Sequence, residues 1–183
     1  MFPAIFSGKT LAPTGPSRAK RAVGGVVALI VAAILFTVAQ AQCATAHLHG
    51  RVVAIADGDT LTVLTGTNQT KIRLWGIDCP EKKQAFGTVA KAALSGLTFG
   101  RDVDVEVLGT DRYGRTLGLV QIGDKKVNLE LVRQGLAWWY RQYAPAAKDL
   151  AGAEQAARLA KRGLWADADP VAPWEFRHGQ RQR

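Results

Sequence analysis

Short segments in which apolar and polar residues alternate constrain the fold of this chain more than any other feature. The clearest is 101–107, in which Val103, Val105 and Val107 fall on one face of an extended strand. Four more segments of strand length lie between turn signals, and they span 51–55, 61–64, 71–75 and 117–122. Five short strands joined by turns predict a small closed Greek-key barrel.

Three segments with a helical spacing of apolar residues accompany these strands. They cover 85–97, 127–134 and 150–162. A glycine follows each of them, at Gly100, Gly135 and Gly163. Because glycine commonly ends a helix, these positions mark helix ends. The sequence therefore predicts an α+β fold that is mainly β, with three helices around the barrel.

The first 41 residues differ from the rest in composition. Residues 1–21 hold four basic residues and no acid, residues 22–39 are almost entirely apolar, and Ala39 and Ala41 flank Gln40. This order is typical of a secretory signal peptide with an A-x-A cleavage site. An uncleaved membrane anchor is the alternative, because the run is close to the ~17–20 residues that a spanning helix needs. In either case the rest of the chain is expected outside the cytoplasm, periplasmic or secreted if the segment is cleaved.

Net charge and cysteine content set further limits. The formal net charge is +9 at pH 7, and removal of residues 1–41 leaves it positive, which suits a polyanionic ligand without identifying one. Two cysteines do not make a disulfide framework. Cys43 lies beside the predicted cleavage region, but Gln42 occupies the position where a lipoprotein signal needs a small residue, so lipidation is not predicted.

Two acidic motifs at the ends of predicted strands indicate a metal site. Asp59 ends the sequence Asp57-Gly58-Asp59, and Asp78 directly precedes Cys79. A barrel can bring these strand ends together, and two carboxylates with a backbone carbonyl suit Ca²⁺, which takes about 6–8 oxygen ligands. The histidines lie near the predicted cleavage site and in the tail, so they do not favour zinc. Taken alone, Asp-Gly-Asp is equally typical of a hairpin turn capped by its own side chains.

Two arginines and a glutamate near these acids suit phosphodiester chemistry. Arg73 precedes the second acidic motif, and Arg115 lies on the turn after 101–107. Guanidinium groups bind phosphate oxygens and stabilise negative charge in a transition state, while Glu81 is placed to act as a general base. A solvated strand face for Arg73 and a helix-leading acid for Glu81 are the ordinary alternatives. None of the three lies in the predicted apolar core, so their replacement is expected to spare the fold.

These motifs resemble those of the micrococcal (staphylococcal-type) nuclease family. The family pattern Asp-Gly-Asp-Thr, followed by Arg-x-x-x-x-Asp-x-Pro-Glu, is met by residues 57–60 and 73–81. A second pattern, Asp-[Lys/Arg]-Tyr-Gly-Arg-x-[Leu/Val]-[Gly/Ala], is met by 111–118, whereas Gln121 stands where the family usually has an aromatic residue. The resemblance covers roughly residues 49–166. It implies a five-stranded OB-fold-type Greek-key barrel with three peripheral helices.

The resemblance also implies roles for particular residues. It implies a calcium site made by Asp59, Asp78 and the carbonyl of Cys79. It implies a catalytic trio of Arg73, Glu81 and Arg115. Family members place a tyrosine in two regions that match Tyr113 and Tyr143, so these two are expected to stack on nucleobases. The five tryptophans are expected to pack within the protein.

The sequence as a whole predicts an exported, calcium-dependent endonuclease that hydrolyses DNA and RNA with little sequence preference. By resemblance, it leaves 3′-phosphates. The alternatives are a catalytically weak nucleic-acid-binding module and a membrane-anchored interaction barrel. The expected organisation is a leader at 1–41, a nuclease domain at 48–166 and an irregular basic tail at 167–183. DNA and RNA are the expected partners of a monomer that has no stable protein partner.

Overall fold

The computed structural model describes residues 46–181 of the chain. The predicted signal peptide or anchor at residues 1–41 and Cys43 lie outside the described residues. No helix within 46–181 is long and apolar enough to cross a membrane.

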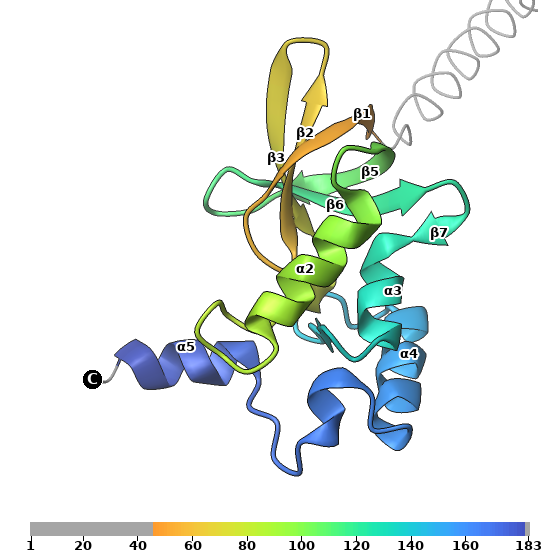
Figure 1. The fold of residues 1–183 in the computed structure, drawn as a ribbon. Helices are drawn as coiled ribbons and strands as arrows, with labels where there is room; N and C mark the ends of the chain where they lie inside the picture. The colour runs from red at the N-terminus through yellow and green to blue at the C-terminus, as the bar shows by residue number, and fades with distance from the viewer. Residues whose placement is uncertain (1–45, 182–183) are drawn as a thin grey trace, which may run out of the picture. The chain divides into compact units, whose positions relative to one another are not determined.

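Five strands within the described residues close into a barrel (Figure 1). They are β1 (Ala46–Ile55), β2 (Thr60–Thr65), β3 (Asn68–Leu74), β5 (Asp102–Thr110) and β6 (Thr116–Ile122). Their order is β3-β2-β1-β5-β6, with antiparallel neighbours throughout. A parallel pairing of β3 with β6 closes the ring. This arrangement confirms the five-stranded barrel of the OB-fold type.

The interior of the barrel is filled by the alternating apolar residues of these strands. On β5, Val103 and Val105 are buried as the pattern predicts. Val107 is only half-buried, because the register of β5 against β6 shifts between Val107 and Gly109. Gly118 pairs with Val107, and a side chain on it would place its Cβ 2.4 Å from Cγ1 of the neighbouring Val105. Glycine at this position therefore makes room for the Val105 side chain.

The remaining elements flank the barrel. Three short strands are present within residues 46–181. β4 (Ile77–Asp78) pairs with β8 (Trp138–Trp139), and β7 (Lys125–Lys126) pairs antiparallel with the end of β6. The helices are α2 (Gly87–Thr98), α3 (Val127–Arg133), α4 (Lys148–Leu159), the 3₁₀ helix η1 (Gly163–Ala166) and α5 (Pro173–Arg181). Helices α2, α3 and α4 match the three predicted ones to within a few residues. Helix α4 ends before 162 because Lys161 takes a left-handed φ of 49°.

The prediction of an irregular tail after residue 166 is wrong for 173–181, which form α5. Proline favours the first position of a helix because its fixed φ is already helical, and Pro173 holds that position. The side chain of Trp174 also packs on Trp138 and Tyr140. This contact agrees with the expectation that the tryptophans pack within the protein, and its partners lie more than 30 residues earlier in the chain.

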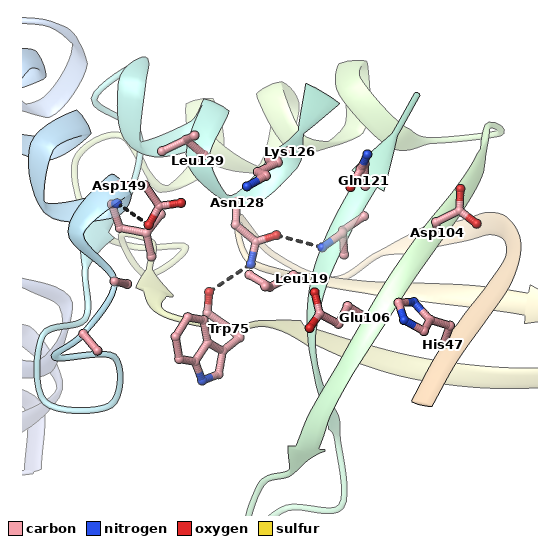
Figure 2. A pocket seen from close by; sticks show the side chains of 14 residues that line it. His47, Trp75, Asp104, Glu106, Leu119, Gln121, Lys126, Asn128, Leu129 and Asp149 are labelled. Carbon is pink, nitrogen blue, oxygen red and sulfur yellow. Dashed lines mark hydrogen bonds between the residues drawn. The ribbon is translucent and has the colours of Figure 1, made fainter. Parts of the chain in front are cut away.

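A buried asparagine ties α3 to the barrel. The Asn128 side chain accepts a hydrogen bond from the backbone N–H of Val120 at 3.0 Å. It also donates to the carbonyl oxygens of Trp75, at 2.9 Å, and Gly118, at 3.2 Å. Figure 2 shows Asn128 reaching from α3 toward Trp75. One side chain therefore satisfies backbone groups of two separate segments.

Replacement of Asn128 with alanine is expected to lower the free energy of unfolding by about 2–4 kcal/mol, because buried backbone groups lose their partners. Urea denaturation of the two proteins measures the difference. Gln121→Ala on the neighbouring strand is the control, since Gln121 is exposed and its loss is expected to change stability by less than ~0.5 kcal/mol. Equal stability of the two variants would contradict this role for Asn128.

Candidate functional site

One arginine joins the two aspartates that the sequence singled out. Nη2 of Arg73 lies 3.0 Å from Oδ2 of Asp59 and 2.8 Å from Oδ1 of Asp78. Its Nη1 donates to the backbone carbonyl oxygens of Leu74 and Ile77, at 3.0 and 2.9 Å. The structure therefore brings together the ends of β3 and β4 and the β1–β2 turn, as the predicted metal site requires.

The burial of this group differs from expectation. Asp59 is 6% exposed, Asp78 is 1% exposed, and the side chain of Arg73 is 12% exposed. Arg73 is thus the counter-ion of two buried carboxylates rather than a surface group. This burial argues against the expectation that replacement of Arg73 would spare the fold, because breaking a buried pair leaves uncompensated charge and typically costs about 3–5 kcal/mol.

The local sequence explains how Asp59 reaches this position. The N–H of Asp59 donates to Oδ1 of Asp57 at 3.1 Å, so the turn is also capped by its own side chain. A side chain on Gly58 would place its Cβ 2.8 Å from the Cβ atoms of both Cys79 and Ala90. The N–H of Cys79 in turn donates to Oδ2 of Asp59 at 2.8 Å. Glycine at 58 therefore allows the close approach of the two acidic motifs.

Burial and neighbouring charges raise the pKa of Asp59. Burial raises the pKa of Asp59 to about 7, and the charges of Asp57 and Asp78 add to this effect. Arg73 and the N–H of Cys79 lower the pKa but do not cancel the rise. A further cation beside these carboxylates would favour the ionised form of Asp59.

The second arginine lies at the same end of the barrel. Arg115 Nε bonds to Oδ2 of Asp111 at 2.7 Å, within the turn between β5 and β6. Its Nη1 lies 3.4 Å from Oγ1 of Thr60, and that hydroxyl lies 3.2 Å from Oδ1 of Asp59. A single hydroxyl group therefore separates Arg115 from the buried carboxylates.

Glu81 joins the same group through Arg177, a residue that no sequence motif marks. Arg177 of α5 places Nη1 2.7 Å from Oε1 of Glu81 and Nη2 2.7 Å from Oδ2 of Asp78. Glu81 and Arg177 are 96 residues apart. No motif or spacing marked Arg177, because its place depends on how the tail docks. We call the seven connected residues the charged network: Asp59, Thr60, Arg73, Asp78, Glu81, Arg115 and Arg177.

The donor atoms in this network fit a hard cation. Asp59 and Asp78 offer carboxylate oxygens, and Cys79 follows Asp78 along the backbone. Burial raises the pKa of the Cys79 thiol well above its usual value, and Sγ lies 3.2 Å from the carbonyl oxygen of Gly58, so a thiolate ligand is disfavoured. In residues 46–181 no three side chains of the His, Cys, Asp and Glu types form a metal-binding group. A cation held here would need backbone and water oxygens as well, which Ca²⁺ accepts.

The two tyrosines expected to contact substrate lie on the surface. Tyr113 is 66% exposed and Tyr143 is 63% exposed. The guanidinium of Arg115 lies 5.5 Å from the centre of the Tyr113 ring, and the Tyr143 ring lies 4.6 Å from that of Tyr140. Both rings therefore leave surface free for stacking. Among the tryptophans, Trp138 and Trp165 are buried together, as the packing interpretation predicts.

The structure also holds a cavity of about 310 Å³, whose lining residues are drawn in Figure 2. Trp75, Leu119, Asn128 and Leu150 are among the residues that line it, and no member of the charged network does. A phosphodiester needs positive charge and an open approach. The charged network holds three arginines, and the side chains of Arg115, Arg177 and Glu81 in it are 27%, 37% and 40% exposed. We therefore place the functional site there rather than in the cavity.

Comparison with known proteins identifies the family that the chain resembles. Residues 71–167 match the family model described as staphylococcal nuclease homologue. Protein ParB of Escherichia coli is 43% identical over 165 residues, which cover 85% of this chain and 93% of ParB. An uncharacterized endonuclease of Escherichia coli O157:H7 is 46% identical over 73% of this chain and 87% of its own length. A micrococcal nuclease of Shigella flexneri is 38% identical over 89% of this chain and 94% of its own length.

Proposed function

The chain belongs to the family of staphylococcal nuclease homologues, and from that membership we propose that it is a calcium-dependent endonuclease acting on both DNA and RNA outside the cytoplasm. The observation that carries the proposal is the charged network. It brings together three arginines, two buried aspartates and a glutamate. A module that only binds nucleic acid does not need a buried acidic pair, so the binding-only alternative is disfavoured.

The arginines supply the charge that the reaction needs. In this mechanism Arg115 donates hydrogen bonds to the non-bridging oxygens of the scissile phosphate, where negative charge increases in the transition state. The terminal nitrogens of Arg73 are held by the two aspartates and two backbone carbonyls, so Arg73 contributes positive charge from the buried side of the site. Asp59, Asp78 and the Cys79 carbonyl would hold Ca²⁺, which supplies Lewis-acid polarisation of the phosphate when bound. Thr60 and Asp111 hold Arg115 in place.

Glu81 handles the proton of the attacking water. A carboxylate oxygen of Glu81 accepts the proton while the water oxygen forms a bond to phosphorus. The bond from phosphorus to the 5′ oxygen breaks, and that oxygen takes a proton from solvent. The products are a 3′-phosphate and a 5′-hydroxyl. Tyr113 and Tyr143 stack on flanking bases, and such contacts tolerate any base because every base has an aromatic face.

Glu81→Gln is expected to lower kcat by ~10²–10⁴-fold, the usual range for loss of a general base. The side chain is 40% exposed, so the melting temperature is expected to stay close to that of the parent. Turnover of single-stranded DNA and RNA measures the loss. Glu106→Gln on β5, outside the charged network, serves as the matched control and is expected to keep full activity. Near-normal turnover of Glu81→Gln would place the catalytic base elsewhere.

Cleavage is expected to need Ca²⁺ and to be poorly supported by Mg²⁺, which demands near-ideal octahedral geometry. Protein stripped with a chelator and then supplied with each metal tests this requirement. Ca²⁺ is also expected to raise the melting temperature, because a ligand that binds the native state stabilises it. Full activity in the presence of chelator would exclude the calcium assignment.

We also propose that the chain is exported and cleaved near Ala41, from the basic, apolar and small-residue order of its first 41 residues. Amino-terminal sequencing of the protein expressed with its own leader checks the cleavage site. A soluble product that begins close to Gln42 is expected. An intact amino terminus in the membrane fraction would mean that the segment is an anchor.

A further inference from the structure

The C-terminal helix is held against the barrel domain by aromatic side chains. The Trp174 ring lies parallel to Tyr140, with an interplanar angle of 3° and centroids 5.2 Å apart. It also meets the edge of Trp138 at 5.5 Å. Ala172, just before the helix, is 2% exposed. Figure 1 shows α5 beside the loop that leads into α2. These contacts fix the position of α5 independently of any charged group.

A second contact joins this segment to the loop that carries Glu81. The N–H of Glu81 donates to Oε1 of Gln84 at 3.1 Å. Nε2 of the same Gln84 donates to the carbonyl oxygen of Val171 at 2.5 Å. One glutamine side chain therefore bridges the Glu81 backbone and the residues that lead into α5. The loop and the tail are therefore joined at two points. One is the Gln84 side chain, and the other is the bond from Arg177 to Glu81.

Arg177 uses both of its terminal nitrogens on the charged network. Nη1 bonds to Glu81 and Nη2 to Asp78, each at 2.7 Å. A planar guanidinium fixes the relative orientation of two acceptors better than an ammonium does, because its donors form a rigid fork. The other oxygen of Asp78 accepts from Arg73 at 2.8 Å and also from Nη1 of Arg177 at 3.4 Å. Glu81 keeps its second oxygen for another partner.

We propose that Arg177 is a positioning residue, which holds Glu81 in a fixed place relative to Asp78 so that its free oxygen faces the attacking water. The inference rests on the proposed function, since it assigns Arg177 a task in that reaction. A glutamate on a loop has several rotamers, and anchoring one oxygen removes most of them before substrate arrives. Preorganisation of this kind raises the rate without a new contact to substrate.

The charge of Arg177 predicts a second measurable effect, on the affinity of the site for Ca²⁺. A guanidinium bonded to Asp78 repels a divalent cation bound by the same carboxylate. Removal of Arg177 is therefore expected to tighten Ca²⁺ binding, since Arg73 still holds Asp78 in place. A loss of turnover together with a gain in metal affinity separates positioning from two other roles. An autoinhibitory arm would raise both when removed, and a purely structural brace would lower both.

The test compares Arg177→Met, which keeps the length of the side chain, with Arg177→Lys and with the exposed neighbour His178→Ala as the control on the same helix. Melting temperature reports folding, and calorimetric titration with Ca²⁺ in the absence of nucleic acid reports metal affinity. Turnover is measured in the parent background and in the Glu81→Gln background. The double variant shows whether Arg177 acts through Glu81.

Arg177→Met is expected to fold normally, to lower kcat at least ~10-fold with little change in KM, and to bind Ca²⁺ at least ~3-fold more tightly. Arg177→Lys is expected to recover part of the turnover. In the Glu81→Gln background, the loss of Arg177 is expected to change turnover less than ~2-fold, because its partner is already impaired.

Three results would overturn the inference. They are higher turnover in Arg177→Met, an equal loss in both backgrounds, and weaker Ca²⁺ binding by a normally folded variant. The outcome for the proposed function is separate. A parent protein without nuclease activity, or Glu81→Gln with parental activity, would refute that function. An impaired Glu81→Gln beside a fully active Arg177→Met would refute only the inference.

Discussion

The pairing of Arg73 with two buried carboxylates is the interaction on which the rest of this structure depends. Buried charges are tolerated only with well-placed partners, because each loses several kcal/mol of hydration. Arg73 meets this need for Asp59 and Asp78 at once, and it also binds the carbonyl oxygens of Leu74 and Ile77. The same side chain therefore compensates two acids and fixes the turn from β3 to β4.

The charged network extends outward from that buried pair. Thr60 connects it to Arg115 on one side, and Arg177 connects it to Glu81 on the other. Thr60 is itself buried, but the side chains of Arg115, Arg177 and Glu81 are 27%, 37% and 40% exposed. A phosphodiester must therefore approach at these three side chains. The buried group of Arg73 and the two aspartates thus supports the exposed side chains that would meet substrate. The strand ends of the barrel hold the buried group in place.

Local patterns in the sequence predicted the parts of this structure that depend on neighbouring residues. The alternation in β5 and the helical spacing in α2 gave the main elements, and the acidic motifs identified Asp59 and Asp78. Three features depend on contacts between distant segments, and the sequence did not reveal them. Val107 is not fully buried, because the strand register shifts beside it. Arg73 is buried rather than solvated. Helix α5 forms where Trp174 packs on Tyr140. Side chains that meet only after folding leave no periodic signal.

The position of Arg177 along the chain also sets the order in which the members of the charged network are synthesised. It is the last member of the charged network to leave the ribosome, 96 residues after Glu81. At a synthesis rate of about 5–20 residues per second, that interval is roughly 5–20 s. The barrel strands, which end at Ile122, emerge well within it. A nascent chain therefore carries the acids and the other two arginines for several seconds before the site is complete.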